Sequence, residues 1–245
     1  MKFDDVKKLH QKKYRSQFGY YLVEGEHLVH ELCNVIDEES ARAITLYITD
    51  EQTQWVASLP FNFSVKLVNN KQMSQLSDTK SPQGIVACVP LDNAISYTSN
   101  QRASYIYLHE VQDPGNLGTI LRSLAWFGSF KLLLSPNSVD PYNSKVVRAS
   151  MGAIFHVEIE TDVPLNTLTN RFSRFAYLDM NGTSINQPSF SDYDCYLFGN
   201  EARGVPSDAL ESMQADAFTI NGSGKIDSLN LASAVNICVY QLSVN

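Results

Sequence analysis

The chain has 245 residues, of which 44% are hydrophobic, enough to bury a packed core in one large domain or two small ones. No apolar run approaches the ~18 residues of a membrane span, and the charged N-terminus MKFDDVKKLHQKKYR is unlike a secretory signal. From these features we expect a soluble protein of the cytoplasm rather than a membrane or secreted protein. The four cysteines are widely spaced without a CxxC pair, so we expect buried thiols and neither a metal site nor a disulfide framework.

The net charge of −7 disfavours a protein that coats nucleic acid by bulk electrostatics, but the charge is unevenly distributed. Six basic and two acidic residues give residues 1–20 a charge of +4. Because the whole chain has a net charge of −7, residues 21–245 have a net charge of −11. Such a basic stretch is commonly the solvated face of a helix. It is also a candidate for local contact with RNA phosphates, through Lys12, Lys13 and Arg15.

Helix-like and strand-like segments alternate in the first part of the chain. Leu28, Leu32 and Val35 have the spacing of one helix face. The segments AITLYIT (43–49), SVKLV (64–68) and SPQGIVACV (81–89) predict strands. Residues 92–102 lose the apolar periodicity and gain Asn, Ser and Asp, which predicts a linker after a first domain at residues 1–95.

A second domain is predicted at residues 103–245. Its predicted strands are residues 105–110, 130–135, 175–180, 194–199 and 217–220, and its predicted helices are residues 116–127, 143–152, 164–173, 206–214 and 228–242. Strands that alternate with helices of this length predict an α/β domain with a mostly parallel sheet covered on both faces. In such a sheet, ligands bind to the loops that leave the carboxyl ends of the strands.

The first unusual loop of this domain is DPGN at residues 113–116, which leads into a helix. Pro and Gly favour a turn, and Asn116 is the candidate cap of the helix. Gly118 and Arg122 share the face opposite the apolar stripe, where a guanidinium has room to meet a planar or anionic group. The alternative is an ordinary surface arginine. The apolar stripe consists of Leu117, Ile120, Leu121 and Leu124.

The second loop is LFGNEARGVP at residues 197–206, which follows an apolar strand. Gly199 allows the backbone to approach a ligand closely, and Asn200 and Glu201 supply polar groups just beyond the strand. Gly204 and Pro206 favour a turn into a helix. The alternative for the glutamate is simple solvation.

The third loop follows the strand at residues 217–220 and enters the last helix, for which Ser228 is the predicted N-cap. Its GSGK tetrapeptide is not a P-loop, because Ile226 stands where Ser or Thr would bind magnesium and Thr219 replaces the upstream glycine. No GxGxxG follows the first strand of either half, which disfavours a nucleotide-dependent oxidoreductase.

Together, DPGNLGTILRSLAWFG, LFGNEARGVP and SLNLASAVNICVYQL resemble the three motifs of the SpoU/TrmH branch of the SPOUT RNA 2′-O-methyltransferases, in the same order and near the same spacings. YRSQFGYYLVEGEHLV and LSDTKSPQGIVACV resemble that family's N-terminal RNA-binding extension. The resemblance implies a small α/β RNA-binding domain at residues 1–95 and a catalytic domain at residues 103–245. It also implies that the C-terminal segment of the catalytic domain forms a deep trefoil knot, which is rare among proteins.

The same resemblance implies an enzyme that methylates RNA with S-adenosylmethionine and without a metal, as a homodimer with each active site at the subunit interface. The full N-terminal extension is more similar to the ribosomal-RNA subgroup than to the transfer-RNA subgroup. One departure is Asn221-Gly222, where the family usually has Pro-Met. The matched cofactor positions are Gly199, Ile220 and Leu229, with Asn200 beside them. The matched catalytic and substrate-positioning residues are Asn116, Arg122, Glu201, Ser228 and Asn230.

These residues predict a mechanism based on positioning and charge. A guanidinium does not lose its proton in proteins, so we expect Arg122 to stabilise the developing alkoxide or to hold the adjacent phosphate. Asn116 and Asn230 would orient the substrate and the arginine. Ser228 would hydrogen-bond in the third loop, and Glu201 would fix the cofactor loop or the arginine. One alternative is a transfer-RNA methyltransferase. Another is a non-catalytic RNA-binding protein with the same fold, and the complete set of catalytic residues disfavours this second alternative.

Overall fold

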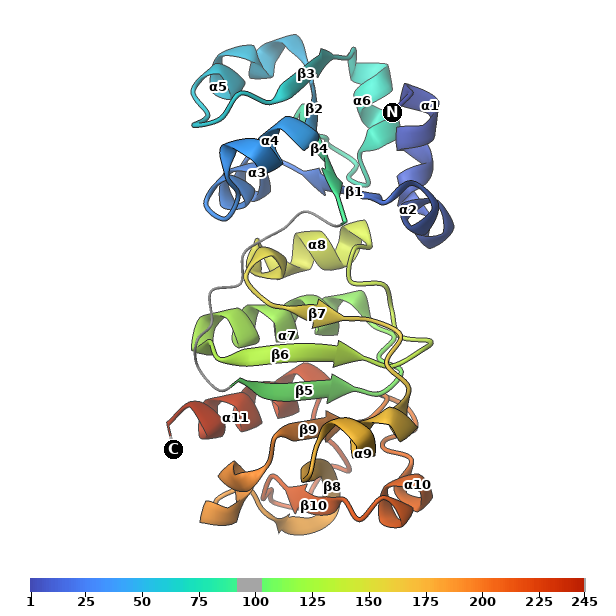
Figure 1. The fold of residues 1–245 in the computed structure, drawn as a ribbon, viewed down its shortest axis with the longest axis vertical. Helices are drawn as coiled ribbons and strands as arrows, with labels where there is room; N and C mark the ends of the chain where they lie inside the picture. Colours follow the sequence, from blue (N-terminus) through green and yellow to red (C-terminus); the bar gives the residue numbers. More distant parts are fainter. Residues whose placement is uncertain (92–102, 245) are drawn as a thin grey trace. The chain divides into compact units, whose positions relative to one another are not determined.

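The computed structural model describes residues 1–91 and 103–244, which form two compact units. The first unit contains residues 1–91 and 140–156, and the second contains residues 103–139 and 157–244 (Figure 1). The predicted linker at residues 92–102 lies outside the described residues. Among the helices that the structure describes, none is long and apolar enough to cross a membrane.

The first unit is built on a mixed sheet with strand order β1-β4-β2-β3, in which β4 is antiparallel to both neighbours and β2 is parallel to β3. Leu22 of β1 and Val86 of β4 pack with Met73 and Leu76 of α6 in a buried cluster. The strands are β1 (Tyr20–Glu24), β2 (Thr45–Ile48), β3 (Ser64–Leu67) and β4 (Ile85–Pro90). The helices are α1 (Phe3–Val6), α2 (Lys12–Phe18), α3 (Glu26–Cys33), α4 (Glu38–Ala43), α5 (Thr53–Ala57), α6 (Asn70–Leu76) and α8 (Ser144–Ser150), with 3-10 turns at Lys7–His10, Asp50–Gln52 and Ala153–Phe155.

Residues 140–156 belong to the first unit although both of their sequence neighbours belong to the second. Helix α8 packs against β1, and the ring of Tyr142 lies 4.9 Å from that of Tyr21. Arg15 Nε donates a hydrogen bond to Asp140 Oδ2 at 2.8 Å. A single cut in the sequence therefore does not separate the two compact units.

The second unit contains a six-stranded sheet with strand order β10-β8-β9-β5-β6-β7. Every neighbouring pair is parallel, so the predicted α/β domain with a mostly parallel sheet is confirmed. The strands are β5 (Ser104–Leu108), β6 (Phe130–Leu134), β7 (Ile159–Glu160), β8 (Phe175–Ser184), β9 (Cys195–Phe198) and β10 (Asp216–Thr219). The helices are α7 (Pro114–Phe127), α9 (Leu168–Arg171), α10 (Ser207–Ser212) and α11 (Leu231–Ser243), with 3-10 turns at Leu165–Thr167 and Pro188–Asp192.

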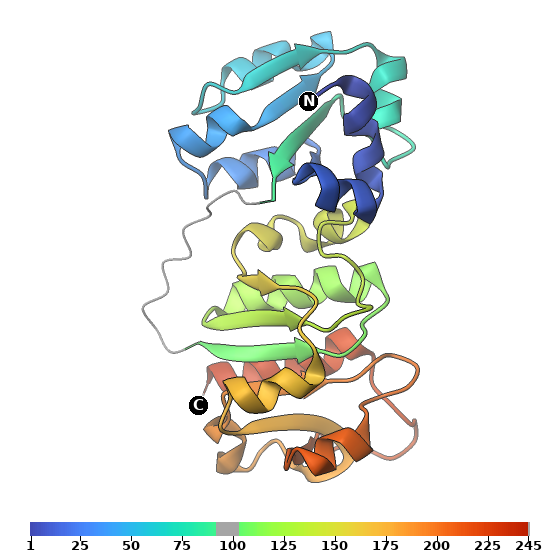
Figure 2. The ribbon, with the colours of Figure 1, turned by 45° about the vertical axis from the view of Figure 1, so that its right-hand side comes forward.

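Helices cover both faces of this sheet. Successive side chains of each strand point to opposite faces, so each strand contributes apolar residues to both layers. Tyr107 of β5 packs in a buried cluster with Leu168 of α9 and Leu210 of α10. On the other face, α7 packs against β6, and α11 packs against α7 (Figure 2). The carboxyl ends of the parallel strands lie at one edge of the sheet, so the loops that follow β5, β9 and β10 are brought to the same edge.

Candidate active site

Three loops of the second unit meet at the carboxyl edge of its parallel sheet. They follow β5, β9 and β10, and together they carry a chain of hydrogen-bonded side chains. Asn230 Nδ2 donates to Asn116 Oδ1 at 2.9 Å, and Asn116 Nδ2 donates to Glu201 Oε1 at 3.2 Å. Three of the predicted catalytic residues, one from each motif, are therefore brought into contact.

Glu201 is held by the loop that follows β5. Its carboxylate accepts hydrogen bonds from the backbone N–H groups of Gln112 and Asp113, each at 3.2 Å. Both carboxylate oxygens have donors, so the side chain has a defined orientation. Glu201 is exposed to solvent, as the alternative interpretation expects, but its carboxylate is also held by the loop after β5.

Asn116 joins this chain because a different residue caps α7. The helix begins at Pro114, and the Asp113 carboxylate accepts a hydrogen bond from the Asn116 backbone N–H at 2.7 Å. The prediction that Asn116 is the cap is wrong. Proline is favoured at the first helical position, where its missing N–H is not needed, and this places the cap at Asp113.

Helix capping also orients Asn230. Helix α11 begins at Leu231, and Asn230 Oδ1 accepts a hydrogen bond from the Ser233 backbone N–H at 3.2 Å, which leaves Asn230 Nδ2 to reach Asn116. The prediction that Ser228 is the cap is wrong, since Ser228 lies two residues before the cap and is exposed. Serine and asparagine are comparable caps, so the sequence alone does not separate them.

Asn200 holds the second loop in shape through its own hydrogen bonds. Its side chain is buried, its Nδ2 donates to the Glu110 carbonyl at 2.7 Å, and its Oδ1 accepts from the backbone N–H groups of Ala202 and Arg203. The backbones of Asn200 and Gly204 exchange two further hydrogen bonds. Both ends of the amide hydrogen-bond within the protein, and whether Asn200 also contacts the cofactor stays a prediction.

Gly199 is also needed by the loop itself. A Cβ at this position would overlap the backbone of Gly204 and Val205. The predicted close approach at Gly199 is therefore present, but the backbone that approaches belongs to the same loop. Whether Gly199 also contacts the cofactor stays a prediction.

Arg122 is separate from the chain of Asn116, Glu201 and Asn230. A helix turns by ~100° per residue, so six positions place Arg122 on a different side of α7 from Asn116. Its side chain is exposed and makes no hydrogen bond or ion pair with a described residue. The predicted apolar stripe of α7 is buried as expected, but Gly118 is buried too, so the open space predicted beside Arg122 does not extend to Gly118.

The third loop provides groups that fit an adenosine-bearing cofactor. Residues 221–229 are exposed and make no backbone–backbone hydrogen bond with a described residue, so their peptide groups are free to pair with a ligand. The apolar side chains of Ile226 and Leu229 are 71% and 45% exposed, so both are available for contact with a ligand. Over residues 1–91 and 103–244, the structure contains no cluster of three metal-ligating side chains.

His109 lies directly after β5 and was not singled out by the sequence. Its Nδ1 is buried and has no hydrogen-bond partner among the described residues. Burial lowers the pKa of His109 below its ordinary value, so the imidazole is neutral at pH 7. A neutral ring stacks on Tyr107, with 6.4 Å between the ring centroids.

The sequence matches two known family models. Residues 103–240 match the SpoU rRNA Methylase family, and residues 2–87 match the MRM3-like substrate binding domain. The first match covers more than half of the chain. The chain belongs to the SpoU rRNA methylase family. The predicted family and the predicted class of enzyme, an RNA methyltransferase, are therefore confirmed.

Similarity to individual SpoU-type proteins extends over both units. The chain is 27% identical to the 23S rRNA (guanosine(2553)-2′-O)-methyltransferase RlmP of Bacillus subtilis, over 98% of this chain and 95% of that protein. It is 26% identical to the structure of a TrmH-family RNA methyltransferase from Porphyromonas gingivalis, with a TM-score of 0.80 over 98% of this chain and 96% of that one. It is 27% identical to an AdoMet-bound rRNA methyltransferase from Sinorhizobium meliloti, with a TM-score of 0.75 over 98% of this chain and 93% of that one.

The predicted RNA contacts lie in the region that matches the substrate binding domain. Lys12 and Lys13 are exposed on α2. Arg15 is only 3% exposed, and its guanidinium donates to Asp140 and to the Leu9 carbonyl. The prediction that Arg15 binds RNA is therefore corrected, because a charge that is buried and paired inside the unit is not available to a phosphate.

Proposed function

We propose that the protein methylates the 2′-hydroxyl of a ribose in ribosomal RNA, with S-adenosylmethionine as the methyl donor. The observation that carries the proposal is the hydrogen-bonded chain of Asn230, Asn116 and Glu201, which joins the loops after β10, β5 and β9. Two relatives support the substrate and the donor: RlmP of Bacillus subtilis is named as a 23S rRNA 2′-O-methyltransferase, and the Sinorhizobium meliloti rRNA methyltransferase is bound to AdoMet.

The second and third loops would hold the cofactor. S-adenosylmethionine supplies an electrophilic methyl group on a sulfonium when it is bound. Ile220 and Leu229 would contact it from the exposed loop between β10 and α11, and Gly199 would do so from the loop after β9. We propose that the same C-terminal segment forms a trefoil knot, which the family resemblance and the packing of α11 against α7 support.

The remaining predicted residues would act on the substrate. Transfer of a methyl group requires the sugar oxygen to be aligned with the reacting carbon, and Asn116 and Asn230 would orient it. Arg122 stays cationic and would stabilise the negative charge that develops on the 2′-oxygen, or hold the neighbouring phosphate. Ser228, exposed in the third loop, would add a hydroxyl to this set.

We propose a homodimer in which Arg122 of one protomer completes the site of its partner. Within one chain, Arg122 lies away from the chain of Asn116, Glu201 and Asn230. Apolar side chains are exposed on the two packed helices α7 and α11, and such a surface is typical of an interface. The exposed side chains are Trp126 at 85%, Ile237 at 39% and Tyr240 at 55%.

The N-terminal region would bind the RNA. We propose that residues 1–95 form the RNA-binding domain and residues 103–245 the catalytic domain, although residues 140–156 of the latter pack in the first compact unit. Lys12 and Lys13 would be phosphate contacts. The match of residues 2–87 to a substrate binding domain supports this assignment. The match of residues 103–240 to an rRNA methylase family favours ribosomal over transfer RNA.

The central test is the variant Arg122→Ala, measured by transfer of tritiated methyl groups onto ribosomal RNA and by calorimetric titration with S-adenosylhomocysteine. We expect turnover to fall about 100-fold or more, since a charge aimed at the transition state is lost, while cofactor binding is retained. Arg171→Ala is the matched control, because Arg171 pairs with Glu160 away from the three loops. Near-normal turnover of Arg122→Ala would remove this residue from the mechanism, and no transfer by the parent protein would favour the non-catalytic alternative.

Mixed dimers test the shared site. Arg122→Ala and Glu201→Ala are each expected to inactivate the homodimer. When the two variants are co-expressed with different tags and purified as a heterodimer, a shared site predicts that activity returns, because one of the two sites then has no defect. A site built from a single protomer predicts an inactive heterodimer, since each site keeps one defect.

A further inference from the structure

We propose that Glu110 and Arg203 form a clamp that positions Glu201 for the reaction. Glu110 lies just after β5, and Arg203 lies in the loop after β9, so the ion pair between them ties these two loops together. The inference rests on the proposed function, because its consequence is read at the proposed methyltransferase site.

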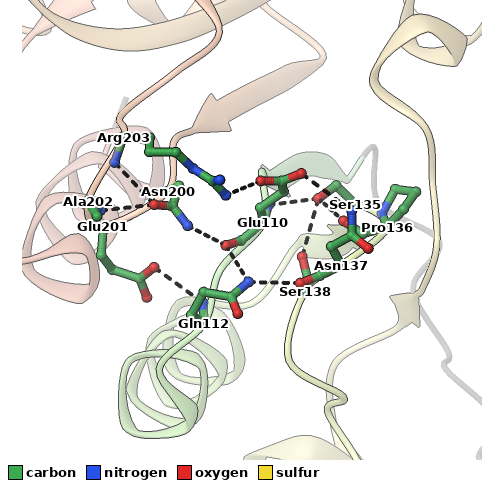
Figure 3. A network of polar contacts seen from close by, with 10 residues as sticks. All are labelled: Glu110, Gln112, Ser135, Pro136, Asn137, Ser138, Asn200, Glu201, Ala202 and Arg203. Carbon is green, nitrogen blue, oxygen red and sulfur yellow. Dashed lines mark hydrogen bonds and ion pairs between the residues drawn. The ribbon is translucent and has the colours of Figure 1, made fainter.

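The clamp is one end of a larger polar network, seen in Figure 3. The Glu110 carboxylate pairs with the Arg203 guanidinium, and the Glu110 backbone N–H donates to Ser135 Oγ at 2.7 Å. Gln112 Nε2 donates to the Glu110 carbonyl at 3.0 Å and to the Asn137 carbonyl at 2.8 Å. The loop after β5 is thus fixed on one side by the loop after β6 and on the other by the loop after β9.

Glu110 holds an unusual backbone conformation at this point. Its φ is 50°, in the left-handed region that non-glycine residues seldom adopt. Residues held in such conformations gather at functional sites, where surrounding contacts maintain them. The contacts that hold Glu110 include the ion pair to Arg203 and the hydrogen bond from Asn200 Nδ2 to its carbonyl oxygen. Further hydrogen bonds link Glu110 to Ser135, Gln112 and Asn137.

The loop after β9 contacts both ends of the segment at residues 110–113. At residue 110, Asn200 and Arg203 contact the backbone and the carboxylate of Glu110. At residues 112 and 113, the Glu201 carboxylate accepts the two backbone N–H hydrogen bonds. Glu201 lies between Asn200 and Arg203 in the sequence, so the contacts of these two residues with Glu110 help to fix its position. The orientation of the Asn116 side chain depends in turn on its hydrogen bond to Glu201.

The exposure of the pair points to a local role. The side chain of Arg203 is 69% exposed and that of Glu110 is 24% exposed. An ion pair with so exposed a partner adds little to global stability. We therefore expect the protein to stay folded when the pair is removed, while the loop after β9 moves more freely. Glu110 and Arg203 would then act as positioning residues for Glu201.

The test uses Glu110→Gln, Arg203→Gln and the charge-exchanged double variant Glu110→Arg/Arg203→Glu in the full chain. Arg171→Gln is the control, because it removes a comparable ion pair, to Glu160, elsewhere in the same unit. For each single clamp variant we expect kcat to fall about 10- to 100-fold with little change in the KM for RNA. We expect the double variant to regain most of the lost turnover.

Hydrogen exchange of the cofactor-free protein gives a readout that is independent of activity. We expect the backbone amides of Gln112 and Asp113 to exchange about three- to tenfold faster in the single variants, since their acceptor, Glu201, is less well held. The clamp is disproved if turnover and exchange in the single variants match those of the control, or if the double variant is as slow as the singles. If the parent protein transfers no methyl group, the proposed function fails, and the exchange rates still decide whether the clamp positions Glu201.

Discussion

Arg15 illustrates how the role of a single residue is set by a distant part of the chain. Lys12, Lys13 and Arg15 are alike in the sequence, yet the two lysines are exposed and Arg15 is buried against Asp140, 125 positions away. The charge pattern of residues 1–20 cannot reveal this partner. The helix caps at Asp113 and Asn230 were missed for a local reason, because an equally suitable polar residue lies within three positions of each.

Removal of the Arg15 side chain is expected to destabilise the first unit. Arg15→Ala leaves the 12% exposed Asp140 carboxylate without its cationic partner, which we expect to lower the free energy of unfolding by about 3 kcal/mol. Urea denaturation followed by circular dichroism measures the change. Lys13→Ala, on the same helix, is the control and should stay within about 0.5 kcal/mol of the parent. Equal stabilities for the two variants would contradict the structural role of Arg15.

The elements of the second unit were largely predictable, whereas the geometry of its loops was not. The five predicted strands are present because each is a compact apolar run, and two-residue β7 was missed because it is too short to carry a pattern. In the first unit, β1 was missed because its apolar residues merge with those of α3. The convergence of Asn116, Glu201 and Asn230 was inferred from a family resemblance, since their contacts depend on strand order, which no local pattern encodes.

The loop after β9 offers a test at the scale of one element. Gly199→Ala adds a Cβ that overlaps the backbone of Gly204 and Val205, so the loop must shift. We expect cofactor affinity, measured by titration with S-adenosylhomocysteine, to fall about tenfold or more, because the displaced loop carries Glu201 with it. Arg171→Ala is the control, since Arg171 pairs with Glu160 away from the three loops. If both variants bind equally well, the close packing at Gly199 does not support the site.

On the scale of the whole molecule, an acidic protein carries a basic N-terminus. Residues 1–20 have a charge of +4 within a total of −7, so long-range attraction to RNA is weak and local contacts must supply affinity. The exposed positions of Lys12 and Lys13 on α2 leave both ammonium groups near the surface of the unit.

Charge reversal at this helix is expected to weaken RNA binding and to reduce its dependence on salt. Lys12→Glu/Lys13→Glu removes two phosphate contacts, so the slope of the logarithm of affinity against the logarithm of salt concentration should flatten by about one to two units. Filter binding of ribosomal RNA fragments between ~50 and ~200 mM salt measures it. Lys71→Glu/Lys80→Glu has the same change in net charge at exposed positions of the same unit. An identical slope in the two double variants would show that only net charge matters.

The division of the first unit between residues 1–91 and 140–156 has a consequence for biosynthesis. A nascent chain that has released its first ninety-one residues from the ribosome still lacks α8, whose Val146 and Val147 are buried in the finished protein. At ~10 residues per second, translation takes roughly several seconds more to reach residue 156. During that interval residues 1–91 lack the apolar side chains of α8 that pack against them in the folded unit. We therefore expect this segment to bind chaperones that act during translation.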